Sequence, residues 1–292
     1  MAHDSQQAPE LPRELPASQV QPFLRWAGSK RWLAARIKSI LPAEFGDYYE
    51  PFLGSGSVFF ALGLDGNRCV LSDSLSPLIN CFEQVRDQPS AVHEAVANWG
   101  CDRESYYAIR GLKPTDDATR AAQFIYLNRL CFNGLYRVNR DGGFNVPYGR
   151  PRFERIFSKP NELHAPSKRL NGTRIHRTDF VSATERATQG DLVYLDPPYV
   201  AGHRNNGFVD YNARVFRWED QRRLSELCDS LTARGVMVIV SNADHPSIRE
   251  LYGSHYRIES LNRFSSMSGN AGARGVSQEL LIVNGPLVEA IS

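Results

Sequence analysis

The sequence is poor in cysteine, has no long apolar run and carries little net charge. Its five cysteines are scattered over 292 residues without a C-x-x-C pair or zinc-ligand spacing, so we expect reduced thiols and no metal. No apolar run could span a bilayer, and the first residues lack the charged-then-apolar order of a signal peptide. A hydrophobic content of 42% allows a sizeable core. We therefore predict a cytoplasmic globular protein.

The small formal net charge of +2 hides a local excess of basic residues. Eleven Lys or Arg and three acids lie between Arg129 and Arg177, so this segment carries +8 and the rest of the chain −6. Phe and Tyr residues are interleaved with these cations, as expected of a surface that meets phosphates and bases. A merely solvated charged surface is the alternative.

Short apolar runs alternate with helical patterns after the first twenty residues. Residues 1–20 are rich in Pro, Gln and Ala, which predicts a disordered tail. From Leu224 to Leu231 apolar residues recur at i, i+3, i+4 and i+7, and Gly235 follows as a helix stop signal. Strands alternating with helices predict an α/β fold with a doubly wound sheet. The predicted strands are 47–52, 68–73, 191–196, 235–242, 256–261 and 278–285.

The middle of the chain departs from this alternation. Helical patterns cover 76–87, 103–112 and 118–132, and a hairpin pattern at 135–149 is centred on Asp141-Gly142-Gly143. We therefore predict an inserted, mainly helical domain that presents a basic hairpin. Its bounds are 76–171, between the two segments of a catalytic domain, 21–75 and 172–292.

Three predicted strand ends carry residues suited to a ligand, and ligands of open α/β sheets bind outside the carboxyl ends of strands. Gly54 and Gly56 in "EPFLGSGSVFF" free the backbone to approach a ligand. Asp73 ends the next strand, where an acid can accept hydrogen bonds from ribose hydroxyls. A tight turn and a helix cap are the respective alternatives. A nicotinamide oxidoreductase is disfavoured because the glycine pattern is incomplete.

The third strand end, "GDLVYLDPPYV", combines an acid, two prolines and an aromatic residue. Pro197 and Pro198 lack N–H donors, so their carbonyl groups and the Asp196 carboxylate can only accept hydrogen bonds. Tyr199 adds a flat aromatic surface. Acceptors beside a stacking surface suit a planar ring with an exocyclic amino group, which predicts a pocket for an extruded base.

Six blocks follow one another along the sequence: "PFLRWAGSKRWLAARI", "YYEPFLGSGSVFF", "LSDSLSPLI", "LNRLCFNGLYRVNRDGGFNVPYGR", "GDLVYLDPPY" and "QELLIVN". Together and in this order they resemble the Dam-like, D12 class DNA adenine-N6 methyltransferases. The resemblance implies a Rossmann-like methyltransferase fold, S-adenosylmethionine as cofactor and double-stranded DNA as partner. It also implies that Trp26, Lys30, Asp73 and Asp196 contact the cofactor or lie between cofactor and base, with Lys30 as counterion of the methionine carboxylate. The backbone from Gly54 to Gly56 is expected to line the methionine moiety.

The resemblance further implies a catalytic role for the loop at 196–199. Asp196 and the Pro197 carbonyl are expected to accept the two hydrogens of adenine N6, which frees the nitrogen lone pair for in-line attack on the methyl group. Tyr199 is expected to stack on the extruded adenine, worth roughly 1–3 kcal/mol.

The hairpin is expected to read the DNA. By resemblance, Arg137 and Pro147 belong to its target-reading part and favour GATC, because Arg137 can bind guanine O6 and N7 together. Contact of Arg137 with phosphate alone is the alternative. Asn133, Arg140 and Arg150 are further predicted DNA contacts.

Two other functions stay open from the sequence. An RNA base methyltransferase is possible because D-P-P-Y loops also occur in ribosomal-RNA enzymes. The other function is that of a DNA-binding relative without catalytic activity. The intact Asp196, Tyr199 and glycine loop argue against it. We expect a monomer. The sequence leaves the biological role open among restriction–modification, a phage or mobile element, and housekeeping.

Overall fold

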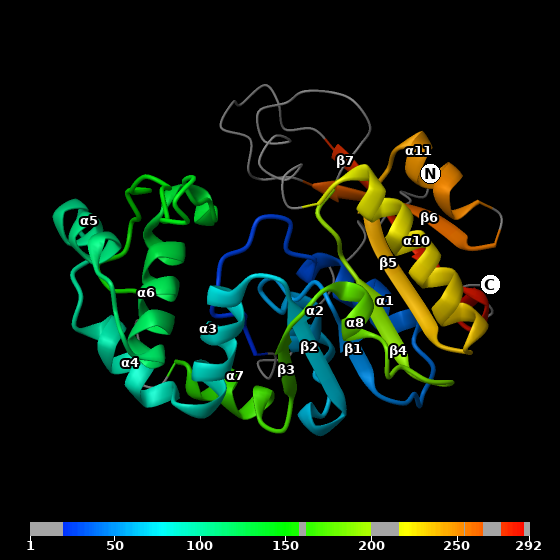
Figure 1. Ribbon diagram of the computed structural model, residues 1–292, viewed down its shortest axis with the longest axis horizontal. Helices are drawn as coiled ribbons and strands as arrows, with labels where there is room; N and C mark the ends of the chain where they lie inside the picture. The colour runs from blue at the N-terminus through cyan, green and yellow to red at the C-terminus, as the bar shows by residue number, and fades with distance from the viewer. Residues whose placement is uncertain (1–19, 158–161, 200–215, 254, 265–275, 289–292) are drawn as a thin grey trace, which may run out of the picture.

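The computed structural model describes residues 20–157, 162–199, 216–253, 255–264 and 276–288, which build a seven-stranded sheet (Figure 1). The sheet order is β3-β2-β1-β4-β5-β7-β6. The first five of these strands are parallel, and β7 runs antiparallel to both of its neighbours. The strands are β1 (Tyr48–Glu50), β2 (Cys69–Asp73), β3 (Arg174–Arg177), β4 (Leu192–Leu195), β5 (Met237–Ala243), β6 (Arg257–Phe264) and β7 (Val276–Val283).

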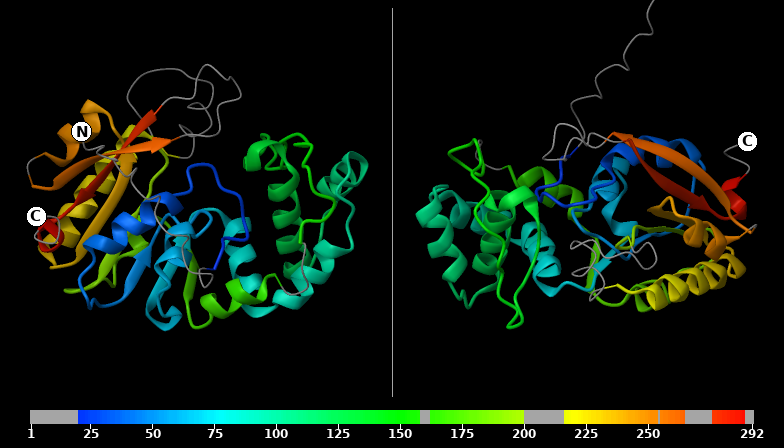
Figure 2. Two further views of the ribbon diagram at one scale, coloured as in Figure 1. Left: turned by 180° about the vertical axis from the view of Figure 1, so that it is seen from behind. Right: turned by 90° about the horizontal axis from the view of Figure 1, so that it is seen from above.

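Helices cover both faces of this sheet. Figure 2 shows α10 and α1 on opposite faces in the view from above. The remaining helices join the strands or stand beside the sheet. The helices are η1 (Arg31–Leu33), α1 (Ala34–Ile40), α2 (Ser57–Leu62), η2 (Gly66–Arg68), α3 (Ser76–Asp87), α4 (Pro89–Ala97), α5 (Arg103–Gly111), α6 (Asp117–Leu130), η3 (Phe132–Gly134), α7 (His164–Leu170), α8 (Phe180–Ala183), α10 (Trp218–Ala233), α11 (Pro246–Tyr252) and α12 (Gly285–Val288).

The apolar runs of the central strands β1, β4 and β5 are continuous because these strands pack on two cores. Tyr48 belongs to the core with α1, α2 and α3, and Tyr49 belongs to the core with α8, α10 and α11. In β4, Leu192 and Val193 are divided between the two cores in the same way. Side chains alternate between the faces of a strand, so burial on both faces requires every residue to be apolar. The predicted α/β fold is thus confirmed, and the mostly parallel seven-stranded sheet is consistent with the predicted Rossmann-like arrangement.

The helical middle of the chain stands beside the sheet in Figure 1. Helix α3 packs against β2 and β3 on one side and against α6 on the other. Buried residues of α4, α5 and α6 therefore join the same hydrophobic core as one sheet face. Because α3 is shared in this way, the bounds 76–171 of an inserted domain stay a prediction.

A basic hairpin follows α6, as predicted, but it has no regular strands. Isolated antiparallel bridges join Cys131 with Tyr148 and Val138 with Phe144. At its tip the Asn139 N–H donates to the Gly143 carbonyl oxygen over 2.8 Å. The predicted tail, residues 1–20, lies outside the described residues except for Val20.

Most predicted elements are confirmed, and a few were missed. The helix pattern ending at Leu231 corresponds to α10, and Gly235 after it has a φ of +75°. The predicted strand 47–52 was too long, because regular pairing ends at Glu50. The sequence analysis missed β3 and α4. All five cysteines are free, which agrees with the expected reduced thiols.

Candidate active site

A cavity of about 1100 Å³ opens where the sheet order reverses. Strands β1 and β4 are parallel neighbours there, although β2 and β3 intervene in the chain. Their carboxyl ends carry the glycine loop and the 196–199 loop, and both loops line the cavity. Such a reversal is the usual ligand site of open α/β sheets, because the loops diverge on either side of it.

The glycine loop is shaped by two residues with positive φ. Gly54 has a φ of +48° and Gly56 a φ of +63°. A Cβ atom at Gly54 would come within 2.9 Å of Trp26 Cδ1, so the loop lies directly on the indole ring. Gly54 and Trp26 line the cavity. Gly56 is buried against Phe60 and is not among the lining residues, so its place in the cofactor site stays a prediction, as do those of Gly54 and Trp26.

Asp73 ends β2 and connects it to the glycine loop. Its Oδ2 accepts a hydrogen bond from Gly54 N over 3.2 Å, and its Oδ1 accepts one from Leu75 N over 3.0 Å. The side chain does not cap α3, whose N-cap residue is Leu75. Burial raises the pKa of Asp73, and these backbone donors oppose that rise. Asp73 lines the cavity with acceptor oxygens beside the loop.

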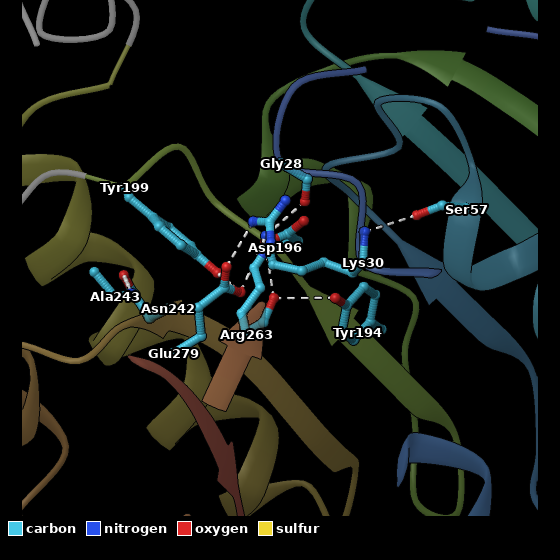
Figure 3. A network of polar contacts seen from close by, with 11 residues as sticks. Gly28, Lys30, Ser57, Tyr194, Asp196, Tyr199, Asn242, Ala243, Arg263 and Glu279 are labelled. Carbon is cyan, nitrogen blue, oxygen red and sulfur yellow. Dashed lines mark hydrogen bonds and ion pairs between the residues drawn. The ribbon is translucent and has the colours of Figure 1, made fainter. Parts of the chain in front are cut away.

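Lys30 and Asp196 form an ion pair at the centre of the cavity wall (Figure 3). Lys30 is 2% exposed, and its Nζ lies 3.1 Å from Asp196 Oδ1. Ser241 Oγ, itself linked to the Tyr194 hydroxyl, donates to the same oxygen over 2.7 Å. Burial raises the pKa of Asp196, whereas Lys30 and Ser241 lower it. Among the described residues no hydrogen bond reaches Asp196 Oδ2, which leaves this oxygen as an acceptor for a ligand.

Glu279 on β7 completes this network, and the sequence analysis did not select it. Its Oε2 accepts a hydrogen bond from the Tyr199 hydroxyl over 2.8 Å and lies 3.5 Å from Lys30 Nζ. Arg263 donates to its Oε1 over 2.7 Å. The Lys30 ammonium also lies 4.5 Å from the centre of the Tyr199 ring. Two cations and two carboxylates, those of Lys30, Arg263, Asp196 and Glu279, therefore meet in one cluster.

A second buried acid, Glu50, ends β1 and was also missed. It is 3% exposed, and its Oε2 accepts hydrogen bonds from the Tyr48 hydroxyl over 2.7 Å and from Phe59 N over 3.2 Å. Burial raises the pKa of Glu50 to about 8 from the usual 4.5. Glu50 lines the cavity, as does Asp179 after β3. An acid at the end of an apolar strand was the available signal for Glu50, whereas β3 has no apolar run that could have pointed to Asp179.

The predicted DNA contacts divide into two groups. Arg137 and Pro147 are exposed and line the cavity. The Arg137 guanidinium lies along the hairpin, where its Nε donates to Asn145 Oδ1 over 2.8 Å. The other three residues are exposed but do not line the cavity; they are Asn133, Arg140 and Arg150.

The three predicted catalytic residues, Asp196, Pro197 and Tyr199, all line the cavity. No cluster of His, Cys, Asp or Glu that could hold a metal occurs within the described ranges. In the same part of the chain, no helix is both long and apolar enough to cross a bilayer. The monomeric state and the cytoplasmic location stay predictions.

The sheet order, with an antiparallel β7 and a cavity at the β1/β4 reversal, is consistent with a Rossmann-like methyltransferase. A family model described as "D12 class N6 adenine-specific DNA methyltransferase" matches residues 26–267. The chain therefore belongs to this family and is an adenine-specific DNA methyltransferase, which confirms the resemblance.

Curated relatives match the chain over most of their own length. The type II methyltransferase M1.LlaDCHI of Lactococcus lactis subsp. cremoris is 34% identical, covering 91% of this chain and 95% of that protein. The DNA adenine methylase of Vibrio cholerae serotype O1 is 35% identical, with 90% and 96% covered. The DNA adenine methylase of Escherichia coli K12 is 34% identical, with 90% and 95% covered.

Proposed function

We propose that the enzyme transfers a methyl group from S-adenosylmethionine to N6 of an adenine extruded from duplex DNA, within GATC. One observation carries this proposal. The acceptor loop at 196–199, the glycine loop with Asp73 and the hairpin residue Arg137 all line one cavity. Cofactor, base and target-reading hairpin can therefore meet without a rearrangement of the sheet.

The cavity wall fits S-adenosylmethionine. Gly54 allows close approach of the backbone, and Asp73 offers carboxylate oxygens for ribose hydroxyls. The cofactor supplies an electrophilic methyl group on a cationic sulfur. Lys30 remains our candidate for the methionine carboxylate, but its ammonium already contacts Asp196 and Glu279. We therefore assign Lys30 to the boundary between the cofactor and the base.

The 196–199 loop holds the base in this proposal. Asp196 Oδ2 and the Pro197 carbonyl accept the two N6 hydrogens, which draws the nitrogen toward tetrahedral geometry and frees its lone pair. Acceptance requires an ionised Asp196, and the nearby Lys30 ammonium favours that form against burial. Tyr199 supplies the stacking surface, and expulsion of water strengthens these interactions.

The hairpin reads and positions the duplex. Arg137 reaches a guanine through O6 and N7 once its hydrogen bond to Asn145 is exchanged for the base. Pro147 lies beside it at the cavity mouth. Asn133, Arg140 and Arg150, which are exposed and outside the cavity lining, contact the DNA backbone. The helical segment 76–171 supports this hairpin as a recognition domain.

Methyl transfer from labelled S-adenosylmethionine tests the proposal. Duplexes containing GATC, a scrambled site, and GATC with N6-methyladenine on both strands are compared with an RNA of the same sequence. We expect transfer only to unmethylated GATC. Transfer to DNA regardless of GATC would overturn the specificity, and transfer to RNA alone would overturn the choice of substrate.

A further inference from the structure

Glu279 is a buried acid on β7, directly before the apolar run of residues 280–283. It is 5% exposed and precedes Leu280 and Leu281, both of which are buried. An ionised carboxylate in such a place is costly unless donors surround it. Its donors come from distant parts of the chain: Lys30 before α1, Tyr199 after β4 and Arg263 on β6. Three segments are therefore joined at one carboxylate.

The three donors belong to the reaction site. Tyr199 and Lys30 line the cavity together with Asp196, and Arg263 borders it. The Tyr199 hydroxyl is at the far end of its side chain, so a hydrogen bond there holds the outer end of the ring as well as the loop. Lys30 lies between Glu279 and Asp196, with Nζ–O distances of 3.5 Å and 3.1 Å (Figure 3). Glu279 thus contacts the predicted stacking residue Tyr199 directly and the predicted acceptor Asp196 through Lys30.

We propose that Glu279 is a positioning residue that holds the stacking ring of Tyr199 and the acceptor carboxylate of Asp196 in one geometry. This inference rests on the proposed function. Glu279 acts on Tyr199 directly, through the hydroxyl, and on Asp196 through Lys30. Arg263 neutralises the remaining charge, since Arg263 and Lys30 balance Glu279 and Asp196. Catalysis itself stays with the 196–199 loop.

A double-mutant cycle tests the direct link. Tyr199→Phe keeps the ring and removes only the donor, so we expect single-turnover methyl transfer to fall about tenfold, the worth of a hydrogen bond to a charged group. Glu279→Ala should cost more, because Lys30 is released as well. In the Glu279→Ala background, Tyr199→Phe should have no further effect. A further tenfold loss in that background would overturn the proposal.

Two further measurements separate positioning from a general loss of structure. Cofactor affinity, measured by calorimetry, should change less than threefold in Tyr199→Phe and in Glu279→Gln. Glu259→Gln is the matched control, because Glu259, on the neighbouring strand β6, forms an ion pair with Arg36 of α1, outside the cavity. It should leave the rate unchanged; a loss equal to that of Glu279→Gln would show that any broken ion pair of this sheet edge slows the enzyme.

Hydrogen exchange keeps the inference separate from the proposed function. The backbone amides of 192–196 and of Tyr199 or its Phe replacement should exchange faster in both Tyr199→Phe and Glu279→Ala than in the wild type, whichever nucleic acid is the substrate. Unchanged exchange would overturn the positioning role even if the wild type methylates GATC. Faster exchange in both variants, together with a wild type that acts only on RNA, would overturn the substrate and keep Glu279 as a positioning residue.

Discussion

Glu50→Gln should remove a large pH dependence of stability. Burial raises the pKa of Glu50 to about 8, against 4.5 for an ordinary glutamate. Between these pH values the folded protein keeps a proton that the unfolded chain releases, so the free energy of unfolding falls as pH rises. The difference of about 3.5 units corresponds to about 5 kcal/mol, at 1.36 kcal/mol per unit. Glutamine keeps the shape and an acceptor for the Tyr48 hydroxyl but cannot ionise.

The assay is urea unfolding of the cofactor-free protein from pH 5 to 8.5, followed by the fluorescence of its four tryptophans. Burial also raises the pKa values of Asp73 and Asp196, so the wild-type curve alone would not isolate Glu50. The difference between Glu50→Gln and wild type does. From pH 5 to pH 8.5, the free energy of unfolding of the variant minus that of the wild type should rise by several kcal/mol. The variant should be less stable than the wild type, or equally stable, at pH 5 and more stable at pH 8.5.

A matched control removes a carboxylate that is not enclosed. The Glu259 side chain is 30% exposed and pairs with Arg36, and Glu259→Gln should change stability by 0–1 kcal/mol at most, roughly equally at each pH. A constant difference between Glu50→Gln and wild type would refute the reasoning, because it would mean that Glu50 is ionised at the same pH in both states. A change in the denaturant slope would instead show a change in exposed surface.

Three further substitutions test the site. Gly54→Ala would bring a Cβ within 2.9 Å of Trp26 Cδ1 at a φ of +48°; we expect about tenfold weaker cofactor binding by calorimetry, and unchanged affinity would contradict the role of this loop. Ser241→Ala removes a donor that lowers the pKa of Asp196, so the acidic limb of the kcat/KM profile should move to higher pH; a move to lower pH would contradict it. Arg137→Ala should lower discrimination between GATC and a site altered at the guanine by about tenfold to a hundredfold; equal loss on both duplexes would indicate a phosphate contact.

The strands that the sequence predicts are those buried on two faces. Apolar residues are uninterrupted in β4 and in residues 237–240 of β5, and this pattern separates these strands from the surrounding helices. The missed strand β3 lies at the sheet edge, where only Ile175 of its four residues is buried. Helix α4 was missed because only Gln88, the C-cap residue of α3, separates the end of α3 from the start of α4 at Pro89. Edges and short connections therefore carry too little pattern to be predicted.

The site was predictable where its chemistry follows a strand in the sequence. Asp73 and Asp196 end predicted strands, and both line the cavity. Glu279 could not be placed, because its role depends on the antiparallel pairing of β7 with β5 and β6, which brings it to Tyr199 and Arg263. An acid directly before an apolar run was the one local signal, and this signal does not indicate which residues Glu279 contacts.

The position of Lys30 explains how a buried carboxylate can serve as an acceptor. Burial alone favours the protonated form of Asp196, which would donate a hydrogen bond where N6 also needs to donate. The Lys30 ammonium opposes that preference only while it stays beside Asp196, and a lysine side chain has a flexible four-carbon stem. Gly28, whose carbonyl oxygen accepts from Nζ over 2.7 Å, and Glu279 hold it from the other sides. In the proposed function, the acceptor chemistry of the 196–199 loop thus depends on Lys30, 166 positions before Asp196 in the chain, and on Glu279, 83 positions after it.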